Sequence, residues 1–441
     1  MGKVPVSLAC WACAAMVSGA LAEDRQIESA TLPVAVAVAA SPERLAGGAS
    51  LDLATALSQA EARSPAMAAS RLEAEATRYE VDQAGVRPNP ELGMDLEDAT
   101  RRQRTATVSL SQRLELGGKR AARVQAAQKA QEVAEVQTQQ QRVETRAAVT
   151  SAFFDTLIAQ ERIALAQEAL KLSQLGTNVA DKRVVAGKVS PVELTRAKVA
   201  EAQMRMELTK AQGDFQGSLH LLRSALGGSV SVDRVDGNLL VVPTLPTVQA
   251  LLDSADRSPA RRKAGLEMER WSAQAAVERS LRTPDVTLSM GVKREQESAR
   301  NALVVGISMP LPVFDRNVGN ELAALKRRDK AEEDARALAL TQRADLLSAH
   351  QRWVSATQVT QLMRQEVLPG AESAYAAATR GFSLGKFSYL EALDAQRTLL
   401  EAKTQYFASL ADAYRAASDV ERLIGEPVFG AVAVSPTPTS K

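Results

Sequence analysis

The sequence predicts a mostly α-helical protein with a transmembrane β-barrel, built from one strand-strand-helix-helix unit that occurs twice. Three observations lead to this fold class. Short motifs recur at an interval of about 200 residues, which indicates an internal duplication. Each copy contains two segments in which polar and apolar residues alternate, and a long stretch without proline follows each pair of segments.

The composition favours closely packed helices. The 441 residues are 45% hydrophobic but only 4% aromatic, and alanine is abundant, which lets helix backbones approach and favours helix. The formal net charge is +2, and the basic residues are interspersed with Asp and Glu. The sequence therefore gives no indication of nucleic acid as a partner.

The N-terminus has the pattern of an export signal over residues 1–22. Lys3 precedes an apolar run that ends in the small-residue cleavage site Ala20-Leu21-Ala22. Cys10 and Cys13, the two cysteines of the chain, lie inside this segment, so the exported chain would have no disulfide or thiolate chemistry. A lipid anchor on Cys10 is the alternative, although the residues before it lack the usual aliphatic position.

No other stretch has the roughly 18 uninterrupted apolar residues of a membrane-spanning helix, so a membrane span would have to be made of strands. Residues 23–50 form an N-terminal tail of Ala, Pro and Ser composition.

Internal repetition defines two units, 51–226 and 248–425. Ser64-Pro65 recurs as Ser258-Pro259, and GKVSPVEL (187–194) recurs as GKFSYLEA (385–392). The segment 227–247 between the units is rich in Gly, Pro and Val and is expected to be an equatorial linker. A C-terminal tail is expected over 426–441.

The first unit begins with a helix, and each unit has two strands, expected at about 91–97 and 105–113 in the first unit and at about 285–293 and 302–309 in the second. Charged connectors at 98–104 and 294–301 make each pair a hairpin. Every strand has one apolar and one polar face, which fits a soluble sheet packed on a core or a barrel with lipid outside and water inside. In a barrel the polar positions would face the lumen: Asp95, Ser109, Ser289 and Ser308.

A long helix is expected after each hairpin, from Lys119 to about Ala186 and from about Gly319 to Val367. The first would be roughly 100 Å long, which no compact domain needs. Its apolar residues are mostly small and its polar residues are spread around it, so the pattern favours lateral coiled-coil packing with water on at least one side.

The repeated motif is expected to be the turn of a helical hairpin. Gly187 and Gly385 can end one helix in a left-handed conformation, and Ser190 and Ser388 can cap the next. Glu193 and Glu391 then occupy the third helical position and complete a capping box, and Pro191 takes the first helical position.

These features together resemble the TolC-like outer-membrane efflux channel family over nearly the whole exported chain. The resemblance rests on the paired turns, the duplicated hairpins and the segments RPNPEL (87–92), SQRLELGGKR (111–120) and PLPVFDRNVGN (310–320). The last two are most similar to the outer-membrane component of cobalt-zinc-cadmium type heavy-metal efflux systems.

The resemblance implies a homotrimer in the outer membrane of a Gram-negative bacterium, with four strands per chain in one 12-stranded barrel and the helices in a periplasmic tunnel. It also implies a periplasmic adaptor protein and an inner-membrane RND pump as partners. A barrel needs closure, since a strand edge open to lipid is not tolerated.

The same resemblance places a constriction at the turns. It assigns acidic positions to Glu391 and Asp394, with Glu193 as the partner from the first turn and Lys386 in place of the arginine that the family carries. It assigns adaptor contact to the tips at Gly187, Ser190, Gly385 and Ser388. A capping box explains Glu193 and Glu391 without any role in a pore, whereas Asp394 lies beyond the cap on the helix face of Glu391.

The residue pattern does not suggest an enzyme, a cofactor or a bound metal. His220 and His350 are the two histidines and stand alone on expected helices, and Met204 and Met206 are expected to be packing residues. The expected function is a passive, gated exit duct of a tripartite efflux pump that conducts divalent heavy-metal cations. A channel for drugs or proteins and a soluble periplasmic coiled-coil scaffold are the alternatives.

Overall fold

The computed structural model describes residues 50–97, 104–228, 232–239, 246–296, 299–384 and 386–429. The expected export signal with Cys10 and Cys13 lies outside the described residues, as do the tail up to residue 49 and the turn residue Gly385. Most of the expected C-terminal tail, from residue 430 on, also lies outside them.

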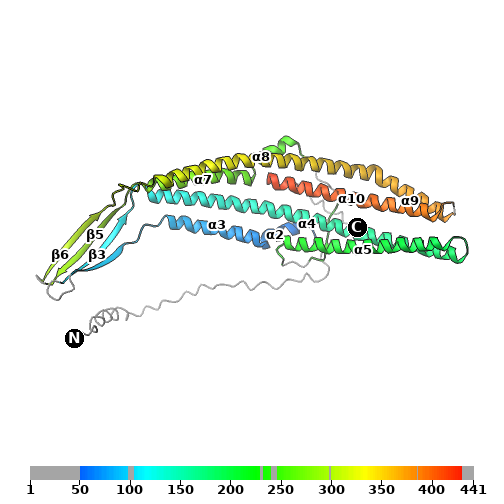
Figure 1. Ribbon diagram of the computed structural model, residues 1–441, viewed down its shortest axis with the longest axis horizontal. Coiled ribbons are helices and arrows are strands. Elements are labelled where there is room, and N and C mark those ends of the chain that lie inside the picture. Colours follow the sequence, from blue (N-terminus) through cyan, green and yellow to red (C-terminus); the bar gives the residue numbers. More distant parts are fainter. Residues whose placement is uncertain are drawn as a thin grey trace, which may run out of the picture. The chain divides into compact units, whose positions relative to one another are not determined.

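Two copies of one unit follow each other along the chain (Figure 1). The first copy consists of α2 (Leu53–Arg63), α3 (Pro65–Ala84), β2 (Glu91–Glu97), β3 (Thr105–Leu114), α4 (Lys119–Val185) and α5 (Pro191–Ala225). The second consists of α6 (Val248–Asp256), α7 (Pro259–Ser280), β5 (Val286–Glu295), β6 (Arg300–Ser308), α8 (Val318–Leu362), a π-helix η1 (Met363–Val367), α9 (Leu368–Ser383) and α10 (Tyr389–Ile424).

A serine-proline pair divides the helical segment that opens each unit. Pro65 and Pro259 occupy the first position of α3 and α7, where the missing N–H costs no hydrogen bond. Ser258 caps α7 by accepting a hydrogen bond from Arg261 N. The helix after each break packs on the long helix of its own unit, α3 on α4 and α7 on α8, and α7 also packs on α4.

The four longer strands form one antiparallel sheet in the order β2-β3-β5-β6. Both expected hairpins are present, with Gly93 opposite Ser109 in the first and Ser289 opposite Gly306 in the second. The two units join through β3 and β5, where Leu110 lies opposite Met290. Strands β2 and β6 are the edges of this sheet.

The first long helix is one uninterrupted α-helix of 67 residues, as the proline-free stretch predicts. The second long helix differs from its expected range of about Gly319 to Val367. The helix does not stop at Val367: the chain passes through η1 and continues as α9 to Ser383, with Pro369 and Gly370 just after the π-helix. Within the described ranges, none of the helices is apolar over enough of its length to cross a membrane.

The largest core lies where the two units meet in the middle of the helices. It joins α2, α4, α5 and α10 through a cluster that includes Phe153, Leu157, Leu222 and Leu410. A second cluster around the fully buried Trp353 joins α6, α8 and α10.

Two short segments cover this core. β1 (Ser50–Leu51) pairs in parallel with β4 (Arg234–Val235), so part of the expected linker is a strand; residues 229–231 and 240–245 of that linker lie outside the described residues. The start of the expected C-terminal tail packs on the same core, since the ring of Phe429 lies 5.4 Å from that of Phe154.

Candidate functional site

The polar face of the sheet brings together the four positions that the sequence predicts to share it. The register aligns Ser109 with Gly291 and Ser289 with Gly306, and Asp95 and Ser308 follow on the same face by the two-residue period. The glycines leave space for the hydroxyl side chains opposite them, since a Cβ atom at Gly306 would lie 2.6 Å from Ser289 Oγ. The face therefore presents small hydroxyl side chains, with the charged side chains of Asp95, Glu97 and Lys293 toward one end.

The opposite face of the sheet is apolar and exposed. Its side chains are between 42% exposed at Leu288 and 77% exposed at Leu92. The members are Leu92, Met94, Leu96, Val108, Leu110, Leu288, Met290, Val292, Leu303, Val305, Ile307 and Met309. A soluble sheet buries its apolar face on a core, so this exposure opposes the alternative of an ordinary soluble sheet.

The first helical turn ends α4 as its glycine predicts. Gly187 has a φ of 68°, in the left-handed region that favours glycine, and Lys188 N donates to Arg183 O over 2.9 Å. Ser190 caps α5, but its hydroxyl accepts from Val192 N at 3.3 Å and not from Glu193 N. The expected capping box therefore does not form here, and the half-buried Glu193 is not engaged as a cap.

The second turn has the complete capping box. Glu391 N donates to Ser388 Oγ at 3.3 Å, and Ser388 N donates to Glu391 Oε2 at 2.6 Å. The Ser388 hydroxyl also donates to Glu391 Oε2, at 2.9 Å, and the two hydrogen bonds from the Ser388 backbone and hydroxyl to this carboxylate lower the pKa of Glu391. Glu391 thus caps the N-terminus of α10 at the tip.

Asp394 and Lys386, the other two charged residues predicted at the constriction, do not take part in this capping box. Asp394 is exposed one turn further along α10. The exposed Lys386 has no carboxylate within ion-pair distance among the described residues, and its backbone N–H donates to Gly381 O. Among the described residues, Lys386 therefore makes no ion pair that would hold the tip.

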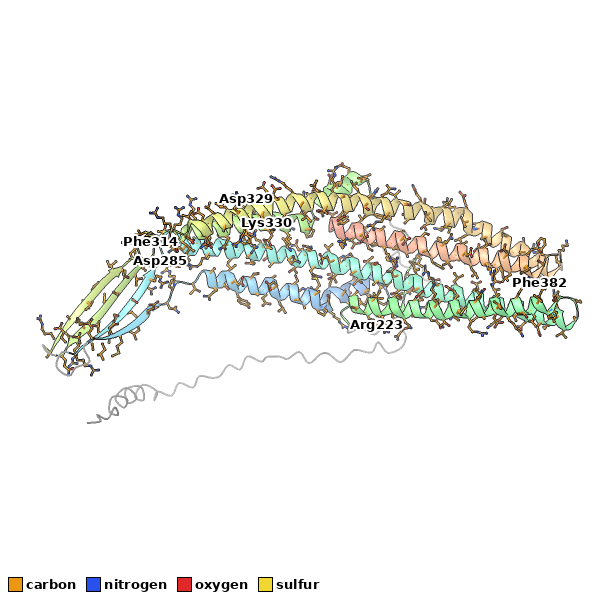
Figure 2. The ribbon with its side chains drawn as sticks, viewed as in Figure 1. Arg223, Asp285, Phe314, Asp329, Lys330 and Phe382 are labelled. Carbon is orange, nitrogen blue, oxygen red and sulfur yellow. The ribbon has the colours of Figure 1, made fainter. Side chains whose placement is uncertain are left out.

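A contact that the sequence does not reveal joins the two turns. Arg183, in the last turn of α4, donates from Nη2 to Phe382 O of α9 at 3.1 Å. Its guanidinium carbon also lies 4.2 Å from the centre of the Phe382 ring, a cation-π geometry. The Phe382 side chain packs with Ala180, Ala197 and Leu393. Figure 2 shows Phe382 at the end of the helices opposite the sheet.

Further from the turns, a groove of about 860 Å³ lies between α4, α5 and α10. Its walls combine basic, acidic and thioether side chains, among them Arg162, Met204, Met206, Glu207, Arg397 and Glu401. Arg397 donates to Gln203 Oε1 at 3.2 Å and so links the two hairpins at this groove. The sequence indicates none of this, because the three helices come from both units.

No group of three or more His, Cys, Asp or Glu side chains within the described ranges is arranged to hold a metal ion. The exposed His220 lies on α5 and the half-buried His350 on α8, in different units.

Comparison with protein families relates the chain to outer-membrane proteins. The family model described as "Outer membrane efflux protein" matches residues 56–228 and again residues 251–426. The two matches correspond to the two units of the fold.

Characterised relatives are metal-resistance proteins. The cobalt-zinc-cadmium resistance protein CzcC of Cupriavidus metallidurans is 40% identical over 377 residues, which cover 85% of this chain and 90% of CzcC. The nickel-cobalt-cadmium resistance protein NccC of Alcaligenes xylosoxydans xylosoxydans is 31% identical over 51% of each chain.

Solved structures share the fold at low identity. CusC, whose folding and transmembrane channel formation were studied, superimposes with a TM-score of 0.72 at 16% identity over 87% of this chain and 96% of CusC. The outer membrane protein VceC of Vibrio cholerae superimposes with a TM-score of 0.69 at 19% identity over 85% of this chain and 96% of VceC.

Proposed function

Because the chain belongs to the outer membrane efflux protein family, we propose that it is the outer-membrane exit duct of a tripartite efflux pump for divalent heavy-metal cations. The exposed apolar face of the sheet carries this proposal, because lipid is the environment that such a face suits. The metal cargo is proposed from the 40% identity to CzcC over most of both chains.

The sheet supports a shared barrel. Four strands with two open edges, β2 and β6, are too few to close on themselves, since single-chain barrels begin at about eight strands. Three copies would join edge to edge into 12 strands, with Asp95, Ser109, Ser289 and Ser308 lining the lumen and the apolar face outward. The long helices would continue this lumen as a tunnel through the periplasm.

The two turns are the proposed constriction and docking point. Around a threefold axis, Asp394 and Glu391 from three chains, with Glu193 beside them, form a ring that attracts cations and repels anions. The turns with Gly187, Ser190, Gly385 and Ser388 would contact a periplasmic adaptor, which couples the duct to an energised inner-membrane RND pump. The duct is passive, and selection of the ion belongs to its partners.

Cell growth tests the cargo. A deletion strain carrying the gene is expected to regain resistance to cobalt, zinc and cadmium but not to organic toxicants. Rescue against organic toxicants alone would replace the metal assignment with a channel for drugs. The native mass of the chain extracted from membranes by detergent is expected to be that of three chains, and a soluble monomer would overturn the channel itself.

Reversal potentials in planar bilayers under a salt gradient test the ring. The Asp394→Asn and Glu391→Gln variant is expected to lose cation preference, because it removes six negative charges from the axis of a trimer. Since Glu391 also caps α10, Asp394→Asn alone is the cleaner variant, and Glu372→Gln on the exposed side of α9 is its control. Reversal potentials that equal those of the wild type would remove Asp394 from the constriction.

A further inference from the structure

One helix of the first unit lacks a neighbour that its counterpart in the second unit has. α7 lies between the long helix of its own unit, α8, and that of the other unit, α4, and packs on both (Figure 1). α3 is the counterpart of α7, since each begins with the proline of a serine-proline pair. Among the described residues, α3 packs along α4 and touches α2, so no second long helix packs beside it.

An ion pair and apolar side chains hold α7 on α4. Glu269 Oε2 lies 2.8 Å from Lys129 Nζ. One turn earlier, Leu266 lines a cleft of about 330 Å³ between the two helices together with Val136. One turn later, Ala273 is buried, with 6% of its surface exposed. The spacing of three and four residues puts Leu266, Glu269 and Ala273 on the face of α7 that meets α4.

The same face of α3 is exposed. Counted from the first residue of each helix, Pro65 and Pro259, the equivalent positions are Leu72, Glu75 and Tyr79. Leu72 is 65% and Tyr79 64% exposed. Glu75 is exposed as well and makes no ion pair within the part of the chain that the structure describes. α3 thus carries an acidic side chain between two large apolar ones on a face that no described element of this chain covers.

α8 carries the charge that matches this face. α4 and α8 each follow a left-handed N-cap residue, Gly118 and Asn317, and counted from these residues Arg328 on α8 corresponds to Lys129 on α4. The Arg328 side chain is 42% exposed. Its Nε and Nη2 donate to the neighbouring Asp329, which leaves Nη1, among the described residues, with donors for a second carboxylate.

The strands give the same correspondence. With these two starting points, the facing residues Gly93 and Ser109 of the first hairpin correspond to Thr287 and Ser308, which face each other in the second hairpin. The two units therefore match residue for residue from the strands into the helices on both sides.

The open strand edges would bring a second copy to this face. Within the chain, pairing of β3 with β5 sets α4, which follows β3, beside α7, which precedes β5. The two edge strands have the same relation to their helices, since α8 follows β6 and α3 precedes β2. Pairing of β6 with β2 of another copy would therefore set α8 beside α3 of that copy.

We propose that the face of α3 formed by Leu72, Glu75 and Tyr79 is the docking surface for α8 of a second copy of this chain, and that Arg328 of the partner subunit binds Glu75 across it. This ion pair repeats the contact between Lys129 and Glu269 and fixes the register of the two helices. The proposal rests on the proposed function, because it specifies how the copies that share the barrel recognise each other along their helices.

Charge reversal tests the ion pair. Glu75→Arg sets two cations against each other at every junction between copies, and the ratio of trimer to monomer in detergent extracts of membranes is expected to fall about tenfold. Arg328→Glu is expected to lower the ratio in the same way. The two changes combined restore a pair of opposite charges and should return the ratio to the wild-type value, which a general loss of structure would not allow.

Glu73→Arg is the control on the same helix. Its counterpart on α7, Glu267, binds Arg270 of that helix at 2.8 Å, so this variant should assemble like the wild type. Single variants at Glu75 and Arg328 that assemble like the wild type, or a double variant that stays dissociated, would overturn the ion pair.

Cross-linking measures the contact without relying on charge. Glu75→Cys and Arg328→Cys are combined in one chain, whose own Cys10 and Cys13 lie in the expected export signal, and a short bifunctional maleimide is added to intact membranes. Linked species of two and three chains are expected, whereas Glu73→Cys with Arg328→Cys should give few. A native mass of three chains without these linked species would overturn the docking surface and leave the duct standing; a soluble monomer would overturn the duct itself.

Discussion

At the residue scale, one carboxylate on α2 ties together the helices that meet in the core. Glu61 accepts hydrogen bonds from Arg142 at 2.6 Å and from Arg146 at 3.4 Å, both on α4. Arg146 Nε also lies 3.7 Å from the buried Glu421 on α10. The hydrogen bond from Arg142 is the main reason that the pKa of Glu61 is lowered, while burial raises the pKa of Glu421.

The lowered pKa of Glu61 predicts a pH-dependent stability. A carboxyl with a depressed folded-state pKa contributes stability above its unfolded value of 4.5, and this is lost as the pH falls through the folded value. Glu61→Gln is expected to lower stability by about 1 kcal/mol at pH 7 and by less at pH 3, measured by thermal unfolding of the detergent-solubilised chain. Glu73→Gln on the exposed side of α3 is the control; an equal loss at both pH values would contradict the role of the charge.

At the element scale, two glycines connect the end of β3 to the start of α4. Gly117 and Gly118 both have positive φ, at 70° and 72°. Just after them, Lys119 Nζ lies 2.6 Å from Asp285 Oδ1, next to the start of β5, and Leu116 N donates to the same oxygen at 3.2 Å. Figure 2 shows Asp285 where the sheet meets the helices. This junction couples the helices of the first unit to the strands of the second.

The two glycines allow a matched test of that junction. Gly118→Ala meets no atom within 4 Å and should cost only the backbone strain, about 1 kcal/mol. Gly117→Ala places a Cβ atom 2.6 Å from the Cβ of Thr283 and is expected to cost about 1–3 kcal/mol more. The melting temperatures of the two variants measure the difference. Equal losses would show that Thr283 can move away and that the junction is not tightly packed.

At the scale of the whole molecule, one chain leaves two features unsatisfied: an exposed apolar face on the sheet and two strand edges. Water penalises the exposed apolar face, and in lipid the unpaired N–H and C=O groups of the two edges would have no hydrogen-bond partner. The proposed trimer in lipid satisfies both at once. The helical part already buries apolar side chains in cores of its own.

Two neighbouring valines on β6 test which face meets lipid. Val305, 65% exposed, lies on the apolar face, and Val304 lies opposite Gly291 on the polar face. Val305→Arg is expected to cost about 2–4 kcal/mol in the membrane and to reduce the amount of trimer extracted from the outer membrane. Val304→Arg should assemble normally and lower cation conductance through the added positive charge. Reduced assembly in both variants, or in neither, would contradict the assignment of faces.

Local pattern was sufficient for most of the fold. The two-residue period of strands determines which side chains share a face, so the alternation in ELGMDLE and its counterparts assigned both faces of the sheet before any packing was known. A left-handed glycine followed by a capping serine is a local device, and it located the first turn. The resemblance to outer-membrane efflux channels is confirmed by the family match to both units. The roles of the tip acids stay predictions.

The rest depended on contacts between residues that are far apart in the chain. Which strand of the first unit pairs with which strand of the second follows from packing across the molecule, so the β3-β5 register has no local signature. Arg183 and Phe382 lie in different units, and no pattern near either residue marks the other as its partner. The first turn carries the same motif as the second, yet Ser190 accepts from Val192 N and not from Glu193 N, so the motif alone did not determine the capping geometry. The local sequence determines which conformations of each segment are low in free energy, and packing between the two units selects among these conformations.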